Sequence, residues 1–180
     1  MIQALRTSAV SKSLLLLFGV HVIVDFFSGI WPIYKTLSGI DVSKAGLIAG
    51  VTGFLGESLQ LFFGFFSDKG YRRHILIFGF LLSSSILFIT FFQGFTSYFA
   101  LLFLLRIGSA AFHPAGIGYV GSLTEEHKSK TILFFSSGGL LGLACSQVIF
   151  TQILQRANGH GLILFIPFFL MAALLSSWES

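Results

Sequence analysis

Six apolar runs of about twenty residues fill almost the whole chain, and no other feature restricts its fold as strongly. They cover residues 13–33, 44–66, 74–93, 98–120, 131–151 and 161–178. A helix needs about 20 predominantly apolar residues to cross the hydrocarbon core of a bilayer. The runs therefore predict an all-α integral membrane protein with six transmembrane helices in one bundle. The short connections between the runs make neighbouring helices antiparallel.

The composition supports this assignment and excludes other classes. Hydrophobic residues make up 54% of the 180 residues and charged residues only 10%. About a quarter of the residues of a soluble domain are charged, so this chain could not cover a water-facing surface. The one cysteine, Cys145, lies inside an apolar run, which leaves no disulfide framework and no cysteine-based metal site. Basic residues gather at the ends of the runs, which indicates a lipid bilayer as the partner and no nucleic acid.

The basic residues also predict the orientation of the chain. If the N-terminus is cytoplasmic, seven Lys and Arg residues lie on the cytoplasmic side and three on the outer side. The seven are Arg6, Lys12, Lys69, Arg72, Arg73, Lys128 and Lys130, and the three are Lys35, Lys44 and Arg156. Because Lys and Arg concentrate in cytoplasmic loops, we expect a multi-pass protein of the plasma (inner) membrane with both termini in the cytoplasm. The first run is too long for a cleaved signal peptide.

Five ionisable residues inside the apolar runs are the candidate functional groups. His21 and Asp25 are four residues apart in the first run, which places them on one helical face. Glu57 lies in the second run, and Arg106 and His113 lie in the fourth. A charge inside hydrocarbon costs ~2.5–3.5 kcal/mol, so such residues face a bundle interior or a wet cavity and usually pair. We expect Asp25 to pair with Arg106, either in a solute or proton pathway or as a structural ion pair.

The connection between the second and third runs carries an unusual set of residues. Gly64, Asp68, Gly70, Arg72 and Arg73 follow one another within ten residues. In a membrane protein this pattern fits a tight cytoplasmic turn, a gating loop whose charges hold two helix ends together. For the arginines, a positive anchor at the membrane surface is an equal alternative. The loop resembles the one between helices 2 and 3 of the major facilitator superfamily of secondary transporters.

Three blocks resemble the fosmidomycin-resistance branch of that superfamily. They are His21-Val-Ile-Val-Asp25, Gln60-Leu-Phe-Phe-Gly64 leading into Ser67-Asp68-Lys69, and Gly108-Ser-Ala-Ala-Phe112-His113-Pro114. The resemblance implies a proton-driven exporter of a drug or small metabolite, in which each half consists of two inverted three-helix repeats. It also places Arg106 where many antiporters of the superfamily have a buried arginine. The paired glycines Gly53 and Gly56, echoed by Gly139 and Gly142, agree with such a repeat.

The resemblance implies twelve helices in two halves, whereas the six runs match the N-terminal half. We therefore expect a small-molecule solute to bind between this bundle and a second one, supplied by another polypeptide or by self-association. The proton gradient is the expected energy source, and no cofactor is expected. Protonation of Asp25 would weaken its attraction to Arg106 and favour one of two orientations of the bundles. The alternatives are a fragment of a longer protein and a truncated or degenerate membrane protein without transport activity.

An intramembrane metalloenzyme that uses His21, Asp25, Glu57 and His113 is a third possibility. The sequence contains no HExxH pair, and these four residues fall in three apolar runs without a recognisable ligand spacing. The sequence therefore predicts neither a metal site nor an enzyme.

Overall fold

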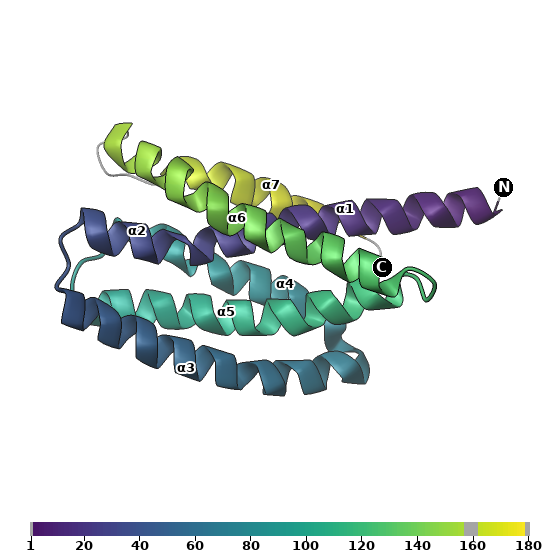
Figure 1. The fold of residues 1–180 in the computed structure, drawn as a ribbon, viewed down its shortest axis with the longest axis horizontal. Helices are drawn as coiled ribbons and strands as arrows, with labels where there is room; N and C mark the ends of the chain where they lie inside the picture. Colours follow the sequence, from purple (N-terminus) through teal and green to yellow (C-terminus); the bar gives the residue numbers. More distant parts are fainter. Residues whose placement is uncertain (1, 157–161, 179–180) are drawn as a thin grey trace.

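The computed structural model describes residues 2–156 and 162–178, and these residues form a bundle of helices without a strand. Most helices run along the long axis of the molecule (Figure 1). The longer elements are α1 (Ile2–Ser28), α2 (Ile30–Leu37), α3 (Val42–Phe66), α4 (Arg72–Ser83), α5 (Phe95–Ser122), α6 (Lys128–Arg156) and α7 (Phe165–Ser176). Three short turns of helix, η1 (Ser67–Tyr71), η2 (Ser84–Phe88) and η3 (Leu162–Leu164), precede or follow them. The all-α fold predicted from the apolar runs is confirmed.

Four stretches of the described chain are long and apolar enough to cross a membrane. They are Val10–Leu37, Val42–Phe88, Phe95–Ser122 and Lys128–Arg156. The second stretch contains both α3 and α4, which are separated by a non-helical Gly70 with φ 98°. A shorter apolar helix, Leu162–Ser176, follows, and the sixth predicted run begins at residue 161, which lies outside the described residues. The number of six spans stays a prediction.

Proline and serine explain two interruptions of the predicted helices. Pro32 has no N–H for the carbonyl of Ser28 and its ring crowds that carbonyl, so α1 ends at Ser28 and α2 begins after Gly29. In the third predicted run, the Ser83 hydroxyl donates to the Gly79 carbonyl at 2.8 Å and the Ser84 hydroxyl to the Leu81 carbonyl at 2.6 Å. Such bonds compete with the backbone, and here α4 tightens into η2.

Glycines bring the main helix pairs into close contact. A side chain at Gly142 of α6 would overlap the carbonyl of Val22 on α1. A Cβ on Gly79 of α4 would lie 2.6 Å from the backbone of Phe112 on α5. Lipid tails are as apolar as the side chains, so small residues that allow backbones to approach are a main source of helix association in membranes. In the expected repeats, α1, α3 and α4 form the first and α5, α6 and α7 the second. The second helix of each repeat packs on the first helix of the other, α3 on α5 and α6 on α1, which agrees with inverted repeats.

Aromatic residues form a band at each end of the bundle. In the first aromatic band, the ring of Tyr98 lies 5.9 Å from Trp31 and 5.8 Å from Tyr34. In the second aromatic band, Tyr119 and Trp178 lie 4.7 Å apart. Tyr98 and Tyr119 are 21 residues apart on α5, which corresponds to about 32 Å of helix. This spacing matches the roughly 30 Å thickness of the hydrocarbon core, and Trp and Tyr prefer its two interfaces.

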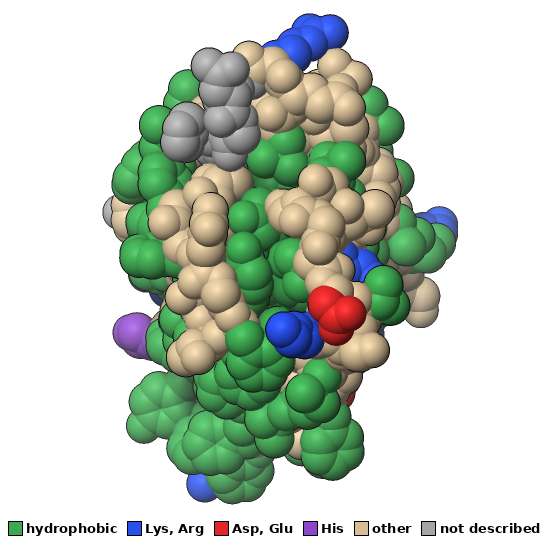
Figure 2. All heavy atoms as spheres, turned by 90° about the vertical axis from the view of Figure 1, so that its left-hand side faces the viewer, with side chains coloured by type: hydrophobic (Ala, Val, Ile, Leu, Met, Phe, Trp, Pro, Cys, Tyr) green, Lys and Arg blue, Asp and Glu red, His purple; other side chains and the backbone are tan. Residues whose placement is uncertain are grey.

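The two ends of the bundle also differ in charge. The Trp178 indole donates to the Ser13 hydroxyl at 3.2 Å, so the end of the described chain lies beside the first predicted span. At this end lie Lys12, Lys69, Arg72, Arg73, Lys128 and Lys130. The opposite end, which faces the viewer in Figure 2, shows few charged side chains among hydrophobic ones. This distribution agrees with the predicted orientation, but which end faces the cytoplasm stays a prediction.

The glycine contact between α1 and α6 makes the first testable prediction. Gly142→Ala introduces a Cβ against the Val22 carbonyl, and overpacking of this kind costs about 1–3 kcal/mol. We expect the melting temperature of the purified protein in detergent to fall by several degrees. Gly53→Ala is the matched control, because nothing lies within 4 Å of a Cβ there and alanine favours helix. Equal melting temperatures for the two variants would contradict the proposed contact.

Candidate functional site

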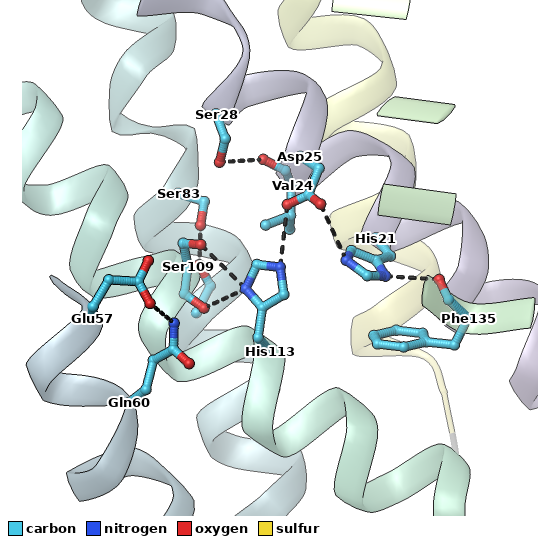
Figure 3. Close-up of polar contacts among 11 residues, drawn as sticks. His21, Val24, Asp25, Ser28, Glu57, Gln60, Ser83, Ser109, His113 and Phe135 are labelled. Atoms are coloured by element: carbon cyan, nitrogen blue, oxygen red, sulfur yellow. Dashed lines mark hydrogen bonds and ion pairs between the residues drawn. The ribbon is translucent and has the colours of Figure 1, made fainter. Parts of the chain in front are cut away.

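A carboxylate between two histidines lies inside the bundle. Asp25 and His21 on α1 face His113 on α5 (Figure 3). Asp25 Oδ2 lies 3.3 Å from His21 Nε2, and Asp25 Oδ1 lies 3.2 Å from His113 Nε2. The exposed fractions of the three side chains are 13% for Asp25, 6% for His21 and 25% for His113. We call these three residues the His–Asp–His cluster.

Backbone carbonyls orient both histidines. His21 Nδ1 lies 2.8 Å from the carbonyl oxygen of Phe135 on α6, and His113 Nδ1 lies 2.8 Å from that of Ser109 on α5. A carbonyl oxygen can only accept a hydrogen bond, so these two contacts assign the proton to Nδ1 of each ring. Nε2 of each ring is therefore the nitrogen presented to Asp25. The Ser109 hydroxyl, which can accept as well as donate, also lies 3.2 Å from His113 Nδ1. The His21 ring also stacks on Phe135 with 4.2 Å between ring centres, which fixes its plane.

The protonation states of Asp25, His21 and His113 decide whether each carboxylate contact is a hydrogen bond. With Nδ1 committed to a carbonyl, Nε2 donates to Asp25 only when the ring is a cation. A neutral ring instead accepts a proton from a protonated Asp25. When the ring is neutral and Asp25 is ionised, the lone pair of Nε2 faces a carboxylate oxygen and the contact is repulsive. His21 Nε2 is buried, and Asp25 Oδ2 at 3.3 Å is not aligned with it for a hydrogen bond.

Helix α6 packs against the cluster through its backbone, at Gly139 and at the Phe135 carbonyl. A side chain at Gly139 would overlap both Asp25 Oδ2 and His21 Nε2. The Phe135 carbonyl that holds His21 lies one helical turn earlier on the same helix. The sequence singled out Gly139 only as part of a repeat and did not identify Phe135. The dense glycines of this helix were the available signal, since they mark a face that another helix approaches closely.

Arg106 does not lie beside Asp25, and the expected ion pair is absent among the described residues. Arg106 precedes His113 by seven residues on α5, about 10 Å along the helix axis. Its Cβ packs against Gly56 of α3, and its Nε is buried without a hydrogen-bond partner. The Asp25 carboxylate contacts His113 rather than Arg106. The two histidines, rather than the arginine, are the ionisable side chains in contact with Asp25.

Glu57 forms no hydrogen bond or ion pair with the cluster in the described chain, although its charge is near enough to act on His113. It is exposed on α3 and accepts a hydrogen bond from the Gln60 side chain at 2.5 Å. Figure 3 shows this pair on its own helix, without a contact to Asp25. Of the five candidate residues in the apolar runs, the fold therefore brings three together and places Glu57 and Arg106 separately.

The turn between α3 and α4 joins three helices through one arginine. Arg72 forms an ion pair with Asp68 at 3.6 Å and donates to the Ser122 hydroxyl at 3.4 Å, at the end of α5. Gly70 adopts φ 98°, a left-handed conformation that favours glycine. The turn is thus anchored to α5 by Arg72.

The other two residues of the predicted gating loop take different places. A Cβ on Gly64 would lie 3.7 Å from Pro114 on α5, an ordinary packing contact. Arg73 is half-buried and forms no ion pair within residues 2–156 and 162–178. The loop therefore holds its helices through Asp68 and Arg72, and a role for Arg73 as a membrane-surface anchor stays a prediction.

Comparison with known proteins agrees with this architecture. A family model described as Major Facilitator Superfamily matches residues 14–178. An uncharacterized MFS-type transporter of Bacillus subtilis (strain 168), YfnC, is 27% identical over 138 residues, which are 75% of this chain but 33% of that protein. The matched part of the chain thus spans about a third of the length of this curated relative. No solved structure matches the chain. Because the family model covers all but the ends of the sequence, the chain belongs to the Major Facilitator Superfamily.

Proposed function

We propose that this chain is the N-terminal six-helix part of a secondary transporter that exports a drug or small metabolite in exchange for protons. The observation that carries the proposal is Asp25, a carboxylate within a membrane-spanning helix that is 13% exposed and contacts two histidines. Ionisable residues at such depth mark ion and solute pathways in membrane proteins. The family supports transport, and the resemblance to the fosmidomycin-resistance branch supports export.

The His–Asp–His cluster is the proposed site of proton exchange. A proton in the contact between Asp25 and His113 holds α1 and α5 together, because it makes a hydrogen bond between the two side chains. Loss of that proton leaves two acceptors 3.2 Å apart, which favours separation of the helices. A change of this kind shifts the balance between two arrangements of a transporter. Arg106 has no acidic partner in the described chain, and its proposed role is to contact the solute.

The solute site is proposed to lie between this bundle and a second six-helix bundle. Alternating access in this family requires one half to move against another around the bound solute. Large apolar side chains point outward from α3 and α6, including Leu61 at 84%, Leu133 at 71% and Leu140 at 70% exposure. They suit either lipid or a partner bundle, which is a second half or a second copy of this chain. A truncated protein without activity is the competing interpretation.

Removal of the carboxylate charge tests the coupling. In vesicles that contain the intact assembly, with fosmidomycin as the first probe solute, Asp25→Asn should lower gradient-driven transport at least tenfold. The reason is that an amide cannot exchange the proton. Glu126→Gln is the matched control, since the Glu126 side chain is 85% exposed and remote from the cluster. A variant that retains wild-type, uncoupler-sensitive transport would exclude Asp25 from coupling.

The turn between α3 and α4 provides a separate test. Asp68→Asn removes the ion pair with Arg72, and because the Asp68 side chain is 81% exposed, stability should change little. Membrane insertion should also be unchanged, because insertion depends mainly on Lys and Arg. We expect slower transport at normal protein levels in the membrane. Transport at the wild-type rate would show that Asp68 is a solvated loop residue.

The chain expressed alone tests the need for a partner. We expect it to insert into the membrane but not to transport as a monomer, because a single bundle has nothing to move against. Solute flux is measured in liposomes that contain only this polypeptide, and the oligomeric state is measured in parallel. Saturable, proton-dependent flux from a demonstrated monomer would contradict the half-transporter interpretation. Flux from a dimer would mean that the chain supplies both halves.

A further inference from the structure

We propose that the His–Asp–His cluster is a binding site for a divalent transition-metal cation, with His21 Nε2, His113 Nε2 and the Asp25 carboxylate as ligands. Two imidazoles and a carboxylate are a common ligand set for zinc and for other first-row metals. The sequence predicted no metal site, because one ligand pair lies on α1 and the third ligand lies 88 residues later on α5. Only the fold brings them together.

The ligand atoms already lie near metal-binding distances. One ligand atom from each residue can be chosen so that all three lie within 4.8 Å of one another. Zinc binds nitrogen and oxygen at ~2.0–2.2 Å, so tetrahedral ligands around it are ~3.3–3.5 Å apart. The measured separations between the Nε2 atoms and the carboxylate oxygens are 3.3 and 3.2 Å. The first distance is to Oδ2 and the second to Oδ1, so each histidine lies at a ligand-to-ligand distance from one carboxylate oxygen. A cation bound by all three residues would use both oxygens, or one oxygen after a small rotation of the carboxylate.

The surroundings of the histidines are those of metal ligands. A histidine that binds a metal almost always donates its other ring N–H to a carboxylate, a backbone carbonyl or water, which fixes the ring and makes it a better ligand. Here both rings direct Nδ1 to a backbone carbonyl, Phe135 for His21 and Ser109 for His113, at 2.8 Å each. Both lone-pair nitrogens therefore point to the same carboxylate.

Among the described residues, the ion-pair contact of His21 Nε2 is with Asp25, which is itself a proposed ligand. His21 is 5% exposed, and its Nε2 is buried without a hydrogen-bond partner. A buried nitrogen without a partner costs free energy, and a bound cation would remove that cost. On the α6 side, Gly139 contributes no side chain that would occupy the space next to Asp25 and His21.

The site can be reached and is not fully coordinated by the protein. His113, at 25% exposure, is its most accessible member. Three protein ligands leave a position of a tetrahedral ion for water or for a solute atom. The carboxylate reduces the charge of a divalent ion to +1, which lowers the cost of placing it within the membrane. Binding of this kind belongs to the polypeptide itself and does not depend on the proposed function.

The test is direct metal binding by the purified, tag-free protein in detergent. After treatment with a chelator, Co²⁺ and then Zn²⁺ are titrated, with visible absorption of Co²⁺ and calorimetry for Zn²⁺. We expect one equivalent with micromolar or tighter affinity. His113→Asn and His21→Asn should each weaken binding at least tenfold. The double variant His74→Asn with His127→Asn is the matched control, since both residues are exposed and lie outside the cluster.

Two measurements keep the result interpretable. Melting temperatures without metal show whether the cluster variants are folded. Pulsed electron paramagnetic resonance of bound Cu²⁺ in the unaltered protein counts the coordinated imidazoles. Two imidazoles are expected, and this result does not depend on whether the variants fold. Absence of one-equivalent binding in the unaltered protein, or binding that persists in the His21 and His113 variants, would overturn the proposal. A single imidazole, or none, would do the same.

Discussion

Close contact between α1 and α6 determines where the polar groups of this protein can lie. Gly142 allows the two backbones to approach, and Gly139, one turn earlier, leaves room for His21 and Asp25. At that distance the Phe135 carbonyl of α6 reaches the His21 ring. A buried carboxylate in an apolar bundle is costly unless several groups face it, and a looser contact would remove one of them.

The sequence was sufficient for the features that depend on composition and local spacing. Apolar runs predicted the all-α membrane fold, and the four-residue spacing of His21 and Asp25 placed them on one face. The role of Gly70 followed from its place between two charged helix ends, and its positive φ agrees with it. Each of these depends on residues close together in the chain, where helical geometry is known in advance.

The partner of Asp25 could not be obtained in the same way. Both Arg106 and His113 lie on one face of α5, and opposite charge alone favours the arginine. The choice depends on the relative depth of α1 and α5 in the bundle, which is determined by tight contacts such as Gly79 against Phe112 and not by local pattern. A shift of two turns separates the two outcomes. From the sequence, His21, Asp25 and His113 were candidate metal ligands together with Glu57, but no site was predicted, because its members converge only after the helices pack.

The aromatic bands have an electrical consequence. Between the first and second bands, the cluster lies near the middle: His113 is closer to Tyr119 along α5, while Asp25 is closer to Trp31 along α1. A charge that reaches Asp25 from either side of the membrane therefore crosses about half of the transmembrane voltage. Moving one elementary charge through 100 mV changes its free energy by ~2.3 kcal/mol, so half of that drop is worth about 1.1 kcal/mol. Occupancy of the cluster by any cation then depends on the membrane potential. The occupancy in an energised cell membrane therefore differs from that of the purified protein in detergent, where no voltage is present.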